Sequence, residues 1–222
     1  MTTINSNDFR TSGRKDLDWY VISCNKVLSE EDIRKFQDLV NWEKISKHQF
    51  LTEDFIREFQ DLVDWENISW FQTLSESFIR EFRDRVNWEK ISFHQKLTED
   101  FIREFRDRVD WFCISTHQEL SEDLTEDFIR EFRDRVDWYI ISKYQKLTED
   151  FIREFQDRVD WEEISNRPGL SEDFIREFRN QVDWSSISFY QDLSKEFIQE
   201  FQDWIDWGEI SKHKGFVREI QS

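Results

Sequence analysis

Four histidines are the residues with the most obvious chemical potential, because imidazoles bind metals and carry protons. His48, His94, His117 and His213 each stand two residues after a serine, in one column of a repeated pattern. Each copy of the pattern supplies a single ring, about 10 Å from the next, whereas a metal site needs several converging ligands. We therefore expect the column to be a slot for rings, which Phe or Tyr fills in other copies, and we expect no metal and no cofactor.

Serine and carboxylate side chains also recur through the chain. An Ile-Ser pair follows each of nine tryptophans, and Asp or Asn directly precedes each of them. A nucleophile or general base acts in a unique constellation with its partners, which a regular repeat does not create. The chain contains no glycine-rich phosphate loop, no CxxC and no HExxH motif. We therefore predict that the protein is not an enzyme.

The internal periodicity of the sequence predicts the structural repeat that carries these residues. The interval between successive tryptophans of the pattern is 23 residues, except for one interval of 27. The copy from Leu51 to Thr73 reads LTEDFIREFQDLVDWENISWFQT. A period of this length is typical of solenoids, in which each repeat packs on its neighbours.

The first half of each repeat predicts a helix of about nine residues. Thr52 is a predicted N-cap, and the acids after it suit the positive end of a helix dipole. Phe55, Ile56, Phe59 and Val63 follow at spacings typical of one apolar stripe.

The second half predicts another helix, of about eight residues, capped by Asp64. Trp65 and Ile68 lie one turn apart on its buried side, followed by Gln72, and Leu74 enters the next repeat. Isolated helices this short are marginal in water, so stacking must supply the burial. We predict an all-α fold, an α-solenoid of about eight two-helix repeats of 23 residues.

The pattern decays at both ends, which is typical of repeats that cap a solenoid. We assign residues 1–27 to a degenerate N-terminal cap, 28–214 to the repeat array and 215–222 to a degenerate C-terminal cap.

Two interruptions break the array. A four-residue duplication near residues 120–123 either extends a helix or bulges a joint. Pro168 and Gly169 replace two residues of the usual pattern, so the second helix should end early there. We predict a bend at one or other of these places.

The charge and the cysteine content limit the kinds of partner and the cellular compartment that we expect for this chain. The net charge of −18 disfavours binding to nucleic acid or to anionic membranes, and it suits a basic protein partner or simple solubility. Cys24 and Cys113 lie far apart, and we find no signal segment and no spanning apolar run. These features predict an intracellular protein.

An arginine stands in the first helix of most repeats, and each has acids within helical reach on both sides. Arg57, for example, should pair with Asp54 and with Asp61. The column is either a neutralised structural ladder, which we favour, or a groove for acidic groups. Its members are Arg57, Arg80, Arg103, Arg130, Arg153 and Arg176.

A few columns of the second helix vary, and large apolar residues replace polar ones there. Such residues reduce solubility unless something covers them. Either the superhelix curls enough to bury them, or they mark a surface for a partner. The candidate partner surface consists of Trp70, Phe93, Phe112, Cys113, Tyr139, Ile140 and Phe189.

The segments LTEDFIREF and VDWxxIS resemble short tandem repeats in proteins of giant DNA viruses of amoebae and of some large phages. The resemblance covers residues 17–217 and implies a binding or scaffolding role in host cytoplasm or virion, without assigned site residues. We expect a non-enzymatic scaffold that binds a protein, such as a basic one. The alternative is a structural protein that assembles into homo-oligomers through its terminal repeats.

Overall fold

The computed structural model describes residues 18–25, 27–117 and 124–213. The chain divides into two compact units, Met1–His117 and Gln118–Ser222, and each is treated by itself. The insertion near residues 120–123, most of the predicted N-terminal cap and all of the predicted C-terminal cap lie outside the described residues. The described part of the N-terminal cap contains helix α2.

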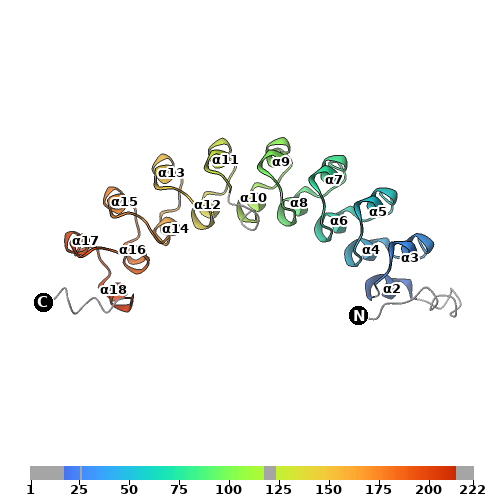
Figure 1. Cartoon of the computed structure of the whole chain (residues 1–222), viewed down its shortest axis with the longest axis horizontal. Helices are drawn as coiled ribbons and strands as arrows, with labels where there is room; N and C mark the ends of the chain where they lie inside the picture. Colours follow the sequence, from blue (N-terminus) through green and yellow to red (C-terminus); the bar gives the residue numbers. More distant parts are fainter. Residues whose placement is uncertain (1–17, 26, 118–123, 214–222) are drawn as a thin grey trace. The chain divides into compact units, whose positions relative to one another are not determined.

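Every regular element among the described residues is a helix, which confirms the predicted α-solenoid of two-helix repeats. Within each unit the first helices, with odd numbers, form one row and the second helices, with even numbers, form another (Figure 1). In unit 1 the first helices are α3 (Glu30–Lys35), α5 (Glu53–Glu58), α7 (Glu76–Glu81) and α9 (Glu99–Glu104), and the second helices are α2 (Trp19–Asn25), α4 (Trp42–His48), α6 (Trp65–Phe71), α8 (Trp88–His94) and α10 (Trp111–His117). In unit 2 the first helices are α11 (Glu126–Glu131), α13 (Glu149–Glu154), α15 (Glu172–Glu177) and α17 (Lys195–Glu200), and the second helices are α12 (Trp138–Tyr144), α14 (Trp161–Ser165), α16 (Trp184–Tyr190) and α18 (Trp207–His213).

The first helix is shorter than predicted, six residues rather than about nine. It begins as expected, because Thr52 Oγ1 accepts a hydrogen bond from the Phe55 amide. It ends at Glu58, because Phe59 leaves the helical region with φ −110° and ψ 27°. The Val63 amide then bonds to the Phe59 carbonyl and closes a separate turn. Phe59 and Val63 are still buried, so the apolar stripe continues through this turn into the joint.

The second helix begins at its predicted cap and usually has seven residues. Asp64 Oδ1 accepts a hydrogen bond from the Asn67 amide at 2.8 Å. As predicted, the proline and glycine shorten one copy, since α14 ends at Ser165 after five residues. Gly169 then has φ 88°, in the left-handed region that favours glycine. The bend at this place stays a prediction.

Burial and ring contacts join consecutive repeats. Phe55, Ile56 and Ile68 are fully buried. Trp65 is half-buried and packs on the next repeat, with its ring centroid 6.2 Å from that of Phe78 and 4.8 Å from that of Phe82. Within each unit, the tryptophan column therefore couples a second helix to the first helix that follows it.

The buried serine of most second helices bridges two repeats within a unit. Ser46 Oγ donates to the Trp42 carbonyl at 2.8 Å and accepts from the Asp64 amide of the next repeat at 2.9 Å. The repeat thus needs a small hydroxyl here to satisfy a backbone amide inside the core. The same pair of bonds occurs at Ser23, Ser69, Ser92, Ser165 and Ser188.

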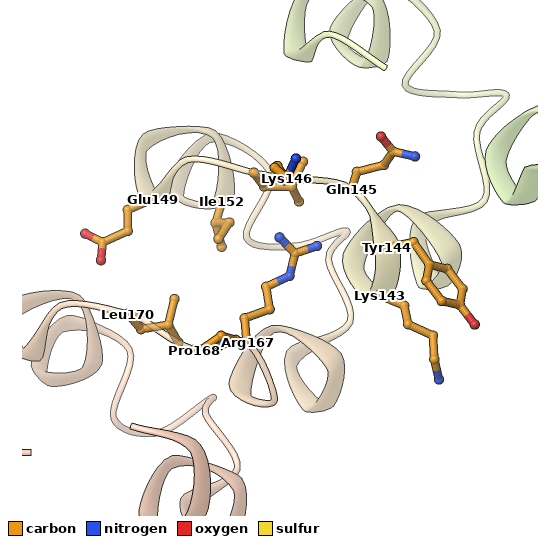
Figure 2. A pocket seen from close by; sticks show the side chains of 11 residues that line it. Lys143, Tyr144, Gln145, Lys146, Glu149, Ile152, Arg167, Pro168 and Leu170 are labelled. Carbon is orange, nitrogen blue, oxygen red and sulfur yellow. The ribbon is translucent and has the colours of Figure 1, made fainter. Parts of the chain in front are cut away.

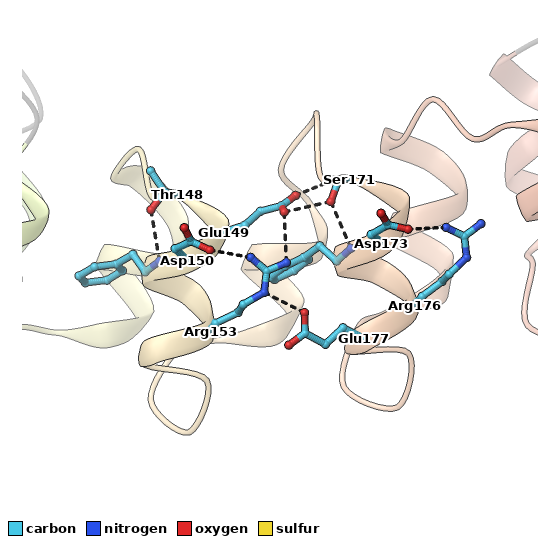
Figure 3. A network of polar contacts seen from close by, with 10 residues as sticks. Thr148, Glu149, Asp150, Arg153, Ser171, Asp173, Arg176 and Glu177 are labelled. Atoms are coloured by element: carbon cyan, nitrogen blue, oxygen red, sulfur yellow. Dashed lines mark hydrogen bonds and ion pairs between the residues drawn. The ribbon is translucent and has the colours of Figure 1, made fainter.

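The arginine column forms a ladder between first helices, illustrated for unit 2 in Figure 3. The predicted ion pair between Arg57 and Asp54 is confirmed at 2.8 Å. The predicted pair with Asp61 is wrong, because the first helix ends before Asp61, which binds Arg85 of the next repeat instead. Arg57 Nε reaches across to Glu81 Oε2 at 2.8 Å. Equivalent pairs 24 residues apart are Arg34–Glu58, Arg80–Glu104, Arg130–Glu154, Arg153–Glu177 and Arg176–Glu200.

Candidate functional site

The seven residues of the candidate partner surface differ in exposure. Phe189 is half-buried, and two of the seven, Cys113 and Ile140, are buried with exposed fractions of 7% and 8%. These two therefore do not belong to an open surface. The exposed members are Trp70 (38%), Phe93 (39%), Phe112 (57%) and Tyr139 (48%).

Cys113 shows why the first of the two alternatives, burial, holds for that column. It is the third residue of α10, and the charges of Glu89 and Lys90 in the preceding second helix act on it. Burial, followed by the hydrogen bond and charge of Asp110, raises the pKa of the Cys113 thiol to about 12. A helix rotates by about 100° per residue, so the second residue faces solvent while the third faces a neighbouring helix. Ile140 occupies the same column in α12.

In unit 1 the structure brings two of the predicted residues together. Trp70 of α6 and Phe93 of α8 stack with their ring centroids 6.2 Å apart. His94 lies 4.5 Å from Trp70 and 4.6 Å from Phe93, and Phe71 lies 6.0 Å from Trp70, between ring centroids. We call Trp70, Phe71, Phe93 and His94 the aromatic surface. It spans two consecutive second helices that pack on each other.

Phe71 was missing from the predicted surface, although the sequence contained a signal for it. It stands in the histidine column, two residues after the serine, where we expected a slot for rings. At His94 this expectation is confirmed by the contacts with Trp70 and Phe93. Within the described residues, no group of three or more His, Cys, Asp or Glu side chains could hold a metal ion.

Lysines pack on the rings of the aromatic surface. Lys90 Nζ lies 4.4 Å from the centroid of Trp70, and Lys47 Nζ lies 5.2 Å from that of Phe71. Such cation–π contacts orient both the ring and the ammonium group. Lys90 also binds Glu89 Oε1 at 2.7 Å, so this lysine is already neutralised.

Glu66 adds negative charge beside the rings. It is exposed and lies one helical turn before Trp70 on α6. No described residue forms an ion pair with it, because position 67 is Asn where α4 and α8 carry a lysine. Glu66 is therefore an exposed carboxylate beside the aromatic surface that a cation from outside can approach without displacing a lysine, unlike Glu89, which binds Lys90.

The aromatic residues of unit 2 are arranged differently. The Tyr139 hydroxyl accepts from Lys143 Nζ at 2.9 Å, and Lys143 also binds Glu163 Oε1 at 2.9 Å. These contacts raise the pKa of Lys143 and lower that of Glu163. Phe189 packs against Tyr190 of its own helix, 4.6 Å between ring centroids. Tyr139 is thus part of a polar network that joins α12 to α14.

None of the described helices is both long enough and apolar enough to cross a lipid bilayer. No protein-family model, no curated protein and no solved structure matches this chain.

Proposed function

We propose that the chain is a non-enzymatic repeat scaffold that binds a protein partner through the aromatic surface of unit 1. The observation that carries the proposal is the pairing of Trp70 with Phe93 across two helices, with more than a third of each side chain exposed. Contiguous exposed rings of this kind mark interaction sites, and tryptophan is enriched among the residues that dominate binding energy.

The frame behind the aromatic surface supports this role. Ser69, next to Trp70, is fully buried and bonds the Trp65 carbonyl and the Asn87 amide at 2.6 and 2.9 Å. These bonds hold α6 against the following repeat before any partner arrives. Binding to a surface that is already ordered loses less conformational entropy.

The acidity of the whole chain and the carboxylate of Glu66 favour a basic partner, whereas the exposed ammonium group of Lys47 beside Phe71 is an opposing charge. Glu66 offers an exposed carboxylate beside Trp70, and the whole chain has a net charge of −18. A partner segment with an apolar side chain next to Lys or Arg would complement both the rings and this carboxylate.

The serine bridges support the non-enzymatic part of the proposal. In each repeat the serine is the hydroxyl that would serve as a nucleophile. Ser46 is fully buried and both of its bonds go to backbone groups. A hydroxyl held in this way has a structural task and no access to a substrate.

A peptide-display selection on the immobilised full chain tests the proposal. We expect selected peptides to contain Lys or Arg next to an apolar residue, and to bind a variant with Trp70→Ala and Phe93→Ala at least about tenfold more weakly. Leu62→Ala is the matched control, since Leu62 is exposed in the joint between α5 and α6. Circular dichroism verifies that both variants fold. Peptides that bind both variants as tightly as the wild type would contradict the proposal.

A second candidate function is self-assembly through the terminal repeats, as a filament-like or virion-associated protein. It is favoured by Trp207, which is 44% exposed although the tryptophans of the preceding repeats are half-buried. An exposed ring in this column could pack on the first helix of another copy. Light scattering and small-angle X-ray scattering across a concentration series test it, because assembly predicts a mass that grows with concentration and a particle that lengthens along one axis.

On either account, we propose an intracellular or virion location, as the resemblance to viral repeats implies.

A further inference from the structure

Most of the described joints between repeats contain a carboxamide from a glutamine side chain. Gln72 Nε2 donates to the Ser46 carbonyl at 3.0 Å and to the Gln49 carbonyl at 2.8 Å. Its Oε1 accepts from the Leu51 amide at 3.2 Å. The side-chain carboxamide of Gln72 thereby satisfies the hydrogen-bonding backbone groups of the joint in the preceding repeat.

The same bonds recur one repeat later. Gln95 Nε2 donates to the Gln72 carbonyl at 2.9 Å, and its Oε1 accepts from the Leu74 amide at 3.0 Å. Gln95 is buried, as Gln72 is. A buried carboxamide that donates to one backbone group and accepts from another is therefore a regular part of this fold.

At one position in unit 2 the glutamine column holds Pro168, so the joint of the preceding repeat lacks this side chain. The joint is Gln145–Leu147, which corresponds to Gln49–Leu51. Within the described residues, no group donates a hydrogen bond to the backbone carbonyl of Gln145, and none accepts a hydrogen bond from the backbone N–H of Leu147. A cavity of about 380 Å³ lies here instead, next to Pro168.

Arg167 forms one wall of this cavity (Figure 2). Its Nε donates to the Ser142 carbonyl at 2.8 Å, and its Nη2 donates to the Ile141 carbonyl at 3.1 Å. Arg167 thus supplies the bond to Ser142 that a glutamine would have made, and it leaves the Gln145 and Leu147 backbone groups unbonded. Burial lowers the pKa of Arg167 to about 10, so the guanidinium is still charged at neutral pH.

We infer that this cavity binds a primary carboxamide, supplied by a Gln or Asn side chain of a protein partner. The NH₂ group donates to the Gln145 carbonyl and the amide oxygen accepts from the Leu147 N–H, as Gln72 does at its own joint. Ile152 and Leu170 line the cavity and offer apolar contacts to the methylene carbons of the ligand. The volume falls in the range of small-ligand pockets, roughly 300–1,000 Å³, and accommodates a glutamine residue.

A carboxylate fits the cavity less well than an amide, even beside Arg167. One of its oxygens would face the Gln145 carbonyl, which is an acceptor and has no proton to give. Among the other lining residues, Glu149 adds negative charge while Lys143 and Lys146 add positive charge, so the preference for an amide rests on the fixed backbone donor and acceptor. A site with fixed donors and acceptors strongly discriminates against a ligand that leaves one of them unpaired.

Titration of the full ¹⁵N-labelled chain with the peptide Gly-Gly-Gln-Gly-Gly, followed by NMR, tests the inference. We expect the Leu147 amide signal to shift, and we expect binding at least about tenfold weaker for the matched peptide with Glu at its centre. Equal or tighter binding of the Glu peptide would show an anion site and overturn the inference, as would an unmoved Leu147 signal. Equal binding of free L-glutamine would overturn the assignment to a protein partner.

The variant Pro168→Gln provides an internal competitor, because it restores the glutamine of the repeat. We expect binding of the Gln peptide to weaken at least about tenfold, and hydrogen exchange of the Leu147 amide to slow because the introduced side chain bonds it. Phe50→Gln is the control, since Phe50 is 96% exposed beside a joint that already contains its carboxamide. This control should bind the peptide like the wild type. A Pro168→Gln variant that protects Leu147 yet binds with unchanged affinity would refute the site.

Discussion

Arg153 Nε lies 2.8 Å from Glu177 Oε2, across the boundary between two consecutive repeats (Figure 3). The same arginine also contacts Asp150 at 2.9 Å and Glu149 at 3.5 Å within its own helix. The hydrogen bond to Glu177 is the main cause that raises the pKa of Arg153. The Arg153 guanidinium thus pairs with carboxylates of its own helix and of the first helix in the next repeat.

This link should contribute modestly to stability and should depend on salt. Both side chains are a third or more exposed, so solvent screens the pair. We expect Glu177→Gln to lower Tm by about 1–2 °C at low salt, with a smaller effect in 1 M NaCl. A double-mutant cycle with Arg153→Gln isolates the pair. A coupling that salt leaves unchanged would contradict the ion-pair explanation.

The hydrogen bonds of the bridging serine should contribute substantially to the stability of the fold. Ser46→Ala leaves the Asp64 amide inside the protein without its acceptor. We expect the free energy of unfolding to fall by about 1–3 kcal/mol, measured by urea denaturation. Ser77→Ala is the control, because Ser77 is exposed on α7. Equal effects of the two substitutions would mean that the bridge is not stabilising.

Two neighbouring phenylalanines should respond very differently to truncation. Phe55 is fully buried, whereas Phe50 is 96% exposed. We expect Phe55→Ala to cost about 3–5 kcal/mol of unfolding free energy, since it opens a cavity in the core. Phe50→Ala should change it by less than about 0.5 kcal/mol. Thermal and urea unfolding of the two variants check the difference, and a similar loss in both would refute the packing described.

Thiol reactivity should separate the two cysteines. Cys113 is buried with a pKa of about 12, so very little thiolate forms at pH 8, whereas Cys24 is half-buried in α2. Because the thiolate is the reactive species, iodoacetamide should label Cys24 well before Cys113 in the folded chain. Mass spectrometry of peptides after timed labelling measures both rates. In urea the two rates should converge, and faster labelling of Cys113 in the folded chain would contradict its burial.

The contact between Lys143 and Glu163 should make the stability of the fold depend on pH in the acidic range. The hydrogen bond to Lys143 holds the pKa of Glu163 below its ordinary value of 4.5. The folded state therefore favours the carboxylate, and its contribution is complete above pH 4.5 and is lost as pH falls through the lower folded pKa. We expect Glu163→Gln to lower the urea midpoint at pH 7, with a smaller difference from the wild type at pH 3. A difference that is the same at both values would contradict this assignment.

The local features of the repeat could be predicted from the sequence because they depend on residues close together in the chain. A Thr52 cap reaches only three residues ahead, and the apolar stripe of Phe55 and Ile56 follows from helical spacing. The 23-residue period then implied stacking, since neither helix buries enough surface alone. The length of the first helix was overestimated, because the Phe59 turn keeps the same apolar spacing without helical geometry.

The side chains that meet across repeats follow from three-dimensional packing and not from local spacing. The serine bridge spans 18 residues, the glutamine bond between Gln72 and Gln49 spans 23, and the arginine pair spans 24. Such contacts depend on the rotation of one repeat against the next, which no local spacing encodes. The same rotation buries Cys113 while it leaves Phe112 exposed, and it brings Trp70 onto Phe93. The period and the two helices of each repeat could thus be predicted from the order of residues, whereas packing between repeats sets the bridges, the aromatic surface and the cavity beside Pro168.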